Sequence, residues 1–305
     1  MTILDADLLE GFVGSVLYKN FHNPVKTPDC HKEWWKLCCS SNKYVAISAP
    51  RGHAKSTAIT FAYVLASVLF RDRSYVVIMS DTEGQATLFL NDIKRELTEN
   101  EHIISLFGVE KLEKDQETDI IVRMSDGHRF RIVAKGSEQK VRGLKWRNRR
   151  PDLVVVDDFE NDEIVMNDDR RIKFRRWVTG ALLPALSDNG VIRIIGTILH
   201  MDSFLENRMP PLHDKHTIIE PLKISSTKKQ GLWVSVKYRA HMDDFSEVLW
   251  PEKYSEERLK EIRADCAAQG LLDIYNQEYL NYPVDESIAI FRRADMLPIV
   301  ESALE

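Results

Sequence analysis

The sequence lacks an apolar run long enough to cross a membrane. Its longest one, Ala58 to Phe70, is shorter than the ~20 residues that a spanning helix requires, and Arg71 follows it, so it predicts a core helix. The amino-terminal segment also lacks the positive charge of a secretory signal peptide, since Asp5, Asp7 and Glu10 stand there. We therefore expect a soluble protein that is not secreted.

Cysteine content and net charge are both low. The chain has 4 cysteines among 305 residues and a net charge of −5. We expect reduced thiols, and the spacing of Cys30-His31 and Cys38-Cys39 fits no common zinc site. The charge argues against a uniformly basic DNA-binding protein, so contact with nucleic acid would need a local basic surface. With 44% hydrophobic residues, the chain can bury the core of one large domain, with or without an appendage.

The stretch APRGHAKST, residues 49–57, matches a phosphate-binding loop in part. The Walker A pattern, G-x-x-x-x-G-K-[ST], binds phosphates with its backbone N–H groups and its lysine, and its hydroxyl binds Mg²⁺. Lys55 and Ser56 fit this pattern, but Ala49 and Ala54 stand where glycines belong. Taken alone, the stretch is equally open to a nucleotide site and to an ordinary turn at Gly52.

The flanking residues favour the nucleotide site. Tyr44 to Ser48 predicts a buried strand before the loop, and Ser56 to Phe70 predicts a buried helix after it. The free N–H groups and the dipole of that helix would point back at the loop and suit an anion. We expect Gly52 to supply the one unusual backbone conformation of the loop, and His53 to face solvent.

The rest of the sequence alternates strands with helices. Apolar runs predict the strands, and helical spacing predicts the helices. The predicted strands are Ser74–Ser80, Asp119–Met124, His128–Ala134, Pro151–Asp158 and Val191–Thr197, and the predicted helices are Glu83–Leu97 and Arg170–Leu183. This alternation indicates an α/β fold with a mostly parallel central sheet flanked by helices, with ligands at the carboxyl ends of the strands.

Two carboxylates, Asp157 and Asp158, end one of these apolar strands. In a P-loop ATPase, an acid in this place holds Mg²⁺, directly or through water, and a neighbouring carboxylate orients the attacking water. The alternative is that the two acids only cap the next helix. The loop and the acids together favour the ATPase.

In their order along the chain, these motifs resemble those of the large terminase subunit of tailed bacteriophages, the motor that packages DNA into proheads. The resemblance rests on HKEW (31–34), APRGHAKST (49–57), Ser80-Asp81 with Gln85-Ala86, Arg142-Gly143, LVVVDDFEND (153–162), IIGTILHMDSF (194–204), LWPEKYSEERL (249–259) and QEYLNYP (277–283). It implies an ASCE-type P-loop NTPase that uses ATP and Mg²⁺, with a small carboxyl-terminal lid or linker subdomain. The loop alanines, and Asp158 where many members carry Glu, depart from the family pattern.

The resemblance also implies roles for individual residues. Those that would bind the nucleotide are Pro50, Arg51, Gly52, His53, Ala54, Lys55, Ser56 and Thr57. Ser56 and Asp157 would hold the metal, Arg51 would sense or stabilise the γ-phosphate, and Gly196-Thr197 would couple hydrolysis to movement. Trp35 could stack near adenine, although two adjacent tryptophans in a helical stretch are more often core residues.

Three assignments stay open. The attacking water would be oriented by Asp158 from a closer backbone, or by Glu160 two residues further on. The basic run Lys140–Arg150 is a solvated loop, contacts DNA phosphates, or offers Arg142 to the ATP of a neighbouring subunit. The chain as a whole is a packaging ATPase, a helicase-like nucleic-acid ATPase, or a non-catalytic nucleotide-binding or scaffolding module.

The predicted organisation has three parts. A helical lead-in covers 1–40, a P-loop ATPase core covers 41–220, and a lid or linker region covers 221–305, in which Lys223–Lys229 is expected to be a mobile loop. By resemblance the last part leads toward a nuclease domain that this chain is not expected to contain, so we expect no nuclease activity. The implied partners are double-stranded DNA, a portal protein, a small terminase subunit and further copies of the chain in a ring, in the host cell cytoplasm and without a membrane.

Overall fold

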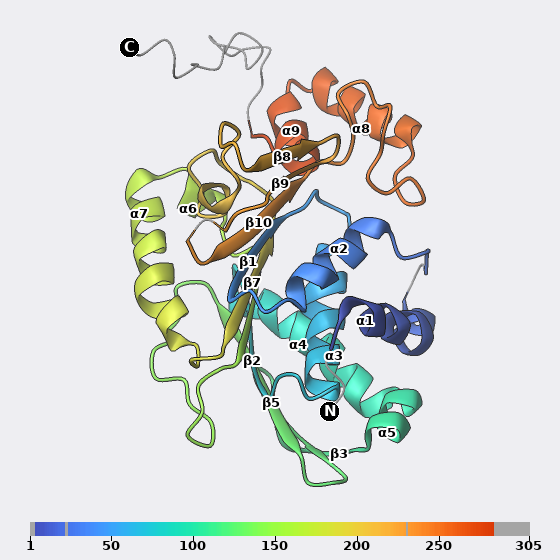
Figure 1. Ribbon diagram of the computed structural model, residues 1–305, viewed down its shortest axis with the longest axis vertical. Coiled ribbons are helices and arrows are strands. Elements are labelled where there is room, and N and C mark those ends of the chain that lie inside the picture. Colours follow the sequence, from blue (N-terminus) through green and yellow to red (C-terminus); the bar gives the residue numbers. More distant parts are fainter. Residues whose placement is uncertain (1–3, 22–23, 230, 284–305) are drawn as a thin grey trace.

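The computed structural model describes residues 4–21, 24–229 and 231–283, so the end of the predicted lid or linker region, 284–305, lies outside the described residues. Within these ranges, the strands form one sheet in the order β3-β4-β5-β2-β6-β7-β1-β10-β9-β8 (Figure 1). The strands are β1 (Tyr44–Ser48), β2 (Tyr75–Ser80), β3 (Val109–Gln116), β4 (Asp119–Met124), β5 (Arg129–Gly136), β6 (Leu153–Asp157), β7 (Val191–Gly196), β8 (Thr217–Glu220), β9 (Lys223–Ser226) and β10 (Trp233–Tyr238).

The middle of the sheet is parallel and buried. The strands from β5 through β2, β6, β7 and β1 to β10 run parallel to one another, and antiparallel strands extend both edges. In β2, Val76 and Ile78 pack into the core on one face while Val77 and Met79 pack into the core on the other, as the period of two along a strand requires. The predicted α/β fold with a mostly parallel central sheet is confirmed.

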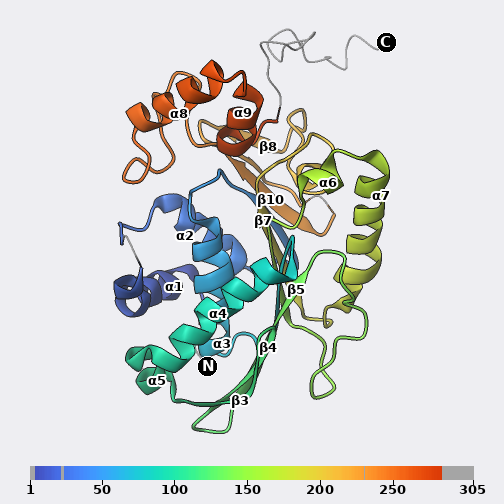
Figure 2. The same ribbon diagram turned by 180° about the vertical axis from the view of Figure 1, so that it is seen from behind.

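Helices cover both faces of this sheet. α1 to α5 lie on one face, α6 and α7 on the other, and α8 and α9 lie at one end, beyond β10 (Figures 1 and 2). The α-helices are α1 (Ala6–Phe12), α2 (Asp29–Cys38), α3 (Val64–Leu69), α4 (Glu83–Glu99), α5 (Glu101–Phe107), α6 (Asp162–Val165), α7 (Asp168–Trp177), α8 (Glu256–Ala268) and α9 (Leu272–Leu280). No helix within the described ranges has the length and the apolar character needed to cross a bilayer.

Short π-helical and 3₁₀ segments join or extend these helices. The π-helical segments are η1 (Val13–Leu17), η3 (Ser56–Tyr63) and η4 (Val178–Leu182), and the 3₁₀ segments are η2 (Tyr18–Asn20), η5 (Leu183–Ala185) and η6 (Glu206–Arg208). η3 runs directly into α3, so the helix predicted after the loop is confirmed, with a wider first part than expected.

The edges of the sheet differ from the sequence prediction. β3 was not predicted, because its mainly charged sequence has no apolar run, and it forms by pairing with β4. The mobile loop predicted over Lys223–Lys229 is wrong at its start, where β9 pairs with β10 and β8. Since β10 lies beside β1, the sheet continues across the predicted boundary at residue 220, and the three-part division stays a prediction.

Candidate nucleotide-binding site

The loop and the two carboxylates meet at the carboxyl ends of neighbouring parallel strands. β7 lies between β1 and β6, and its register pairs Gly196 with Ser48 and Ile195 with Asp157. The loop that follows β1 and the acids that end β6 are therefore only two strand spacings apart. Parallel pairing is what brings these distant segments of the sequence together.

Lys55 is the cation at the centre of this site. Its ammonium is buried, lies 3.1 Å from Oδ2 of Asp158, and donates to Oγ1 of Thr197 over 3.2 Å. Lys55 immediately precedes η3, and the first N–H groups of a helix have no partner within it and carry the positive end of its dipole. A buried cation beside a helix start can bind an anion such as phosphate.

Asp157 carries the feature that best fits a metal ion. Its Oδ2 accepts a 2.6 Å hydrogen bond from Oγ1 of Thr60, but its buried Oδ1 has no hydrogen-bond partner among the described residues. Burial raises the pKa of Asp157 to about 7, and the charge of Asp158 adds to the rise, while the Thr60 hydroxyl opposes it. The Ser56 hydroxyl lines the same cavity. A carboxylate and a hydroxyl are hard oxygen donors, so these residues fit Mg²⁺.

The cavity at this place has a volume of about 280 Å³. It is lined by Ser56, Ser80, Asp81, Thr82, Gln85, Phe89, Asp157 and Asp158. Ser80 to Gln85 were not assigned to the site from sequence, although Ser80-Asp81 and Gln85 follow a buried strand that pairs Ser80 with Asp157. Asp81 accepts a 2.7 Å hydrogen bond from Nδ2 of Asn161, and burial raises its pKa.

The structure separates the two candidates for orienting water. Asp158 has a left-handed backbone (φ 43°), and its Oδ1 accepts the Thr197 N–H over 3.1 Å while Oδ2 faces Lys55. Glu160 is buried instead, and its two oxygens accept the backbone N–H groups of residues 204 and 205 at 2.6 and 2.9 Å. Burial raises the pKa of Glu160 to about 7 against these two donors. Asp158 is thus the carboxylate beside Lys55, and both oxygens of Glu160 are engaged elsewhere.

The loop itself is held by the carboxyl-terminal helices. The backbone N–H of Arg51 donates to the carbonyl of Glu278 on α9 over 2.8 Å, and its exposed guanidinium lies 3.1 Å from the Glu278 carboxylate. Gly52 has φ 75°, and a Cβ there would lie 2.0 Å from the Tyr254 hydroxyl, so only glycine fits. Ala54 also has a positive φ of 53°. The expectation that Gly52 alone takes an unusual conformation is therefore wrong.

Two aromatic assignments are also corrected. His53 is fully buried and stacks on Tyr254, with ring centroids 5.2 Å apart, so it does not face solvent. Trp35 is 1% exposed, and its Nε1 donates to the carbonyl of Ala58 over 2.8 Å. It is a core residue under η3 and cannot stack on adenine in this conformation. Of the remaining loop residues, Pro50 is buried and Thr57 is exposed.

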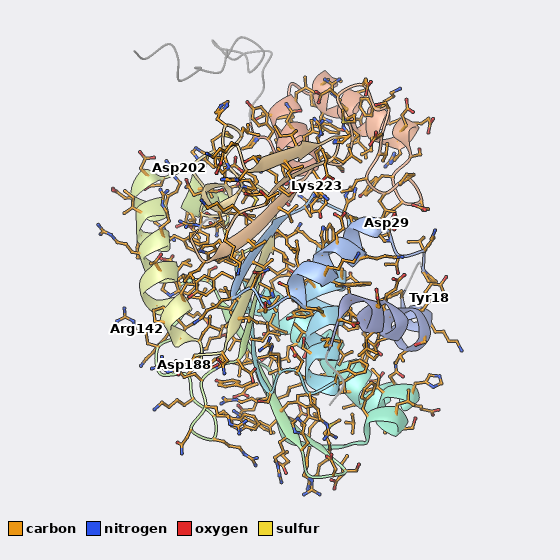
Figure 3. The ribbon with its side chains drawn as sticks, in the orientation of Figure 1. Tyr18, Asp29, Arg142, Asp188, Asp202 and Lys223 are labelled. Atoms are coloured by element: carbon orange, nitrogen blue, oxygen red, sulfur yellow. The ribbon has the colours of Figure 1, made fainter. Side chains whose placement is uncertain are left out.

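Arg142 lies away from the loop of its own chain. Its Nη2 donates to the carbonyl of Gly180, beyond the carboxyl end of α7, over 3.0 Å. Asp202 pairs with Arg171 nearer the amino end of that helix. Figure 3 shows Arg142 near Asp188, which precedes β7, and at the opposite end of the molecule from Asp202, which follows β7. Arg142 does not contribute to the site within one chain.

Comparison with known proteins supports the fold. No protein-family model and no curated protein matches the sequence. The large terminase ATPase domain of Thermus phage P74-26 is 17% identical with a TM-score of 0.59, and the match covers 90% of this chain and 98% of that domain. The large terminase of bacteriophage HK97 is 14% identical with a TM-score of 0.62, covering 92% of this chain and 57% of that one. The resemblance predicted from the motifs is confirmed at the level of the fold.

Proposed function

We propose that the chain is the ATPase domain of a viral DNA-packaging motor, which hydrolyses ATP with Mg²⁺ to move double-stranded DNA into a prohead. The observation that carries the proposal is the position of Lys55, buried at the start of η3 and facing both Asp158 and Thr197. The fold shared with large terminases supports it.

Nucleotide binding would use groups that are already in place. The β- and γ-phosphates would lie against Lys55 and the N–H groups at the start of η3, so phosphate oxygens replace Asp158 as the partner of the ammonium. Ser56 and Asp157 would hold the Mg²⁺, which supplies positive charge against the phosphates.

The same exchange would prepare Asp158 for catalysis. Once phosphate takes over Lys55, Oδ2 of Asp158 is free to orient the attacking water, while the Thr197 N–H holds Oδ1. Thr197 contacts both Lys55 and Asp158, so it is placed to transmit the state of the nucleotide to β7. We assign Glu160 a structural role, because both of its oxygens hold the backbone at residues 204 and 205.

An arginine would complete the site. Arg142 lies too far along α7 to act within its own chain, so it would reach the ATP of a neighbouring subunit in a ring. Arg51 is the alternative within one chain, and it would first have to leave Glu278.

The partners follow from the proposed motor. Duplex DNA would contact the basic run Lys140–Arg150, and a portal protein and a small terminase subunit would complete the complex in the host cytoplasm. Since the chain spans 57% of the HK97 large terminase, activities of a whole terminase are proposals here. Residues 221–305 would act as the lid or linker.

An ATP hydrolysis assay at high protein concentration, with Mg²⁺ and with Lys55→Ala as the reference, tests the proposal. Turnover that depends on Lys55 supports an ATPase, and absence of turnover would favour a non-catalytic nucleotide-binding module. Strand separation by the active protein would favour the helicase-like alternative.

A further inference from the structure

The loop contains two left-handed residues, and one of them is not glycine. Gly52 has φ 75° and Ala54 has φ 53°. A residue with a Cβ rarely adopts this conformation, and it persists only where the surrounding structure imposes it. Something outside the loop must therefore hold the backbone at Ala54.

His31, on α2, holds the peptide that precedes Ala54. Its Nε2 lies 2.8 Å from the carbonyl oxygen of His53. Because a carbonyl oxygen only accepts hydrogen bonds, Nε2 must carry the hydrogen and donate it. The bond fixes the plane of the peptide that joins residues 53 and 54, and so restricts φ of Ala54.

His53 does the same for the peptide that precedes Gly52. Its Nδ1 lies 3.0 Å from the carbonyl oxygen of Arg51, so Nδ1 is the donor. The peptide that joins residues 51 and 52 is fixed in turn. Each left-handed residue of the loop thus follows a carbonyl held by a buried imidazole.

Aromatic packing holds both imidazoles in place. The ring of His31 lies 4.8 Å from Trp34 and 5.0 Å from Trp250, and the ring of His53 stacks on Tyr254. Burial lowers the pKa of each histidine to about 4. Each ring is therefore neutral at neutral pH, with a single N–H that is already given to a loop carbonyl.

We propose that His31 and His53 are positioning residues of the phosphate loop, whose two bonds to backbone carbonyls hold the loop in its anion-binding conformation at a place where the sequence lacks a glycine. This rests on the proposed nucleotide site. The two residues act through the backbone N–H groups of the loop, so they set the affinity for nucleotide more than the chemical step.

Binding of Mg²⁺-ADP, measured by isothermal titration calorimetry, tests this proposal. His31→Leu and His53→Leu leave a buried carbonyl without its donor, so each should weaken binding roughly 5- to 100-fold. His31→Gln should stay within about threefold of wild type, because its amide nitrogen reaches the place of Nε2, and His53→Asn should do the same for Nδ1. The loss should appear in KM for ATP more than in kcat.

Ala54→Gly provides a second, independent readout. Glycine adopts positive φ without the steric cost of a Cβ, so this change in the His31→Leu background should recover about fivefold of the lost affinity. If His31→Leu does not fold, His31→Gln is compared with His31→Asn, whose amide is one methylene too short. Equal affinity in that pair overturns the proposal.

The remaining outcomes separate this inference from the proposed function. Wild-type binding of Mg²⁺-ADP together with unchanged affinity in folded leucine variants overturns the positioning role alone. Absence of binding by the wild type overturns the nucleotide site and, with it, the positioning role.

Discussion

The ammonium of Lys55 lies 3.1 Å from Oδ2 of Asp158, across the space between the ends of β1 and β6. The two residues come from separate segments, and only the placement of β7 between the two strands brings them together. The pair neutralises a buried cation while no phosphate is bound. Phosphate would compete with Asp158 for Lys55, which links binding to the release of the proposed catalytic carboxylate.

Lys55→Ala should reduce ATP turnover by roughly a hundredfold or more, because it removes the charge that faces the β- and γ-phosphates. The fold should persist, since the side chain makes no core contacts beyond Asp158 and Thr197. Steady-state phosphate release is the measurement, and Lys36→Ala, at an exposed position of α2, is the control. Turnover near the wild-type level would remove Lys55 from the site.

Asp158→Asn and Glu160→Gln should separate catalysis from stability. Asp158→Asn should lower kcat by roughly 10²–10⁴ and leave nucleotide affinity largely intact. Glu160→Gln offers one acceptor to two backbone N–H groups, so it should lower the free energy of unfolding by about 1–3 kcal/mol while the folded protein keeps its turnover. An inert Glu160→Gln enzyme that binds ATP, beside an active Asp158→Asn enzyme, would exchange the two roles.

Gly52→Ala should weaken nucleotide binding and lower the free energy of unfolding by about 1–3 kcal/mol, because the new Cβ would lie 2.0 Å from the Tyr254 hydroxyl at a φ of 75°. Gly11→Ala is the matched control, since nothing lies within 4 Å of its added Cβ and alanine favours α1 by about 0.5–1 kcal/mol. Urea unfolding and Mg²⁺-ADP titration measure the two effects. A Gly52→Ala protein as stable as wild type would show that the loop can move away from Tyr254.

The stability difference between wild type and His31→Gln should depend on pH. The pKa of His31 is lowered to about 4 in the folded protein and is about 6.5 when unfolded. Above pH 6.5 the ring is neutral in both states. Between pH 6.5 and 4 only the unfolded state takes up the proton, so wild type should lose about 1.4 kcal/mol per pH unit relative to the variant.

Urea unfolding of both proteins at several pH values between 7.5 and 4.5 measures this difference. Using the difference removes the opposite contributions of Asp157 and Glu160, whose raised pKa values favour the folded state at low pH. A difference that stays constant over this range would show that His31 is protonated equally in both states.

Mixing Arg142→Ala subunits with Lys55→Ala subunits should restore part of the turnover that each lacks alone. A site with an intact Lys55 can then borrow Arg142 from its neighbour, and such an arginine contributes roughly 10³–10⁵ in rate. The mixture is assayed at concentrations where wild type assembles. If turnover does not recover and wild-type activity is independent of concentration, Arg51 within one subunit is the better candidate.

The sequence alone was enough for the elements that local patterns specify. The apolar runs at Tyr44–Ser48 and Leu153–Asp157 form β1 and β6, because buried parallel strands are apolar on both faces. Lys55 and Asp157 could be proposed for the site because a loop after one such strand and an acid at the end of another must lie at the same edge of a parallel sheet.

Only the tertiary structure decided the rest. His53 is buried by Trp250 and Tyr254, and Trp35 by the start of η3, contacts that no local pattern specifies. β3 and β9 are strands because partners pair with them, not because of their own polar sequences. The direction of Glu160 depends on backbone N–H groups at residues 204 and 205. Burial and hydrogen-bond pairing of this kind depend on residues far apart in the chain, so they appear only when the chain is folded.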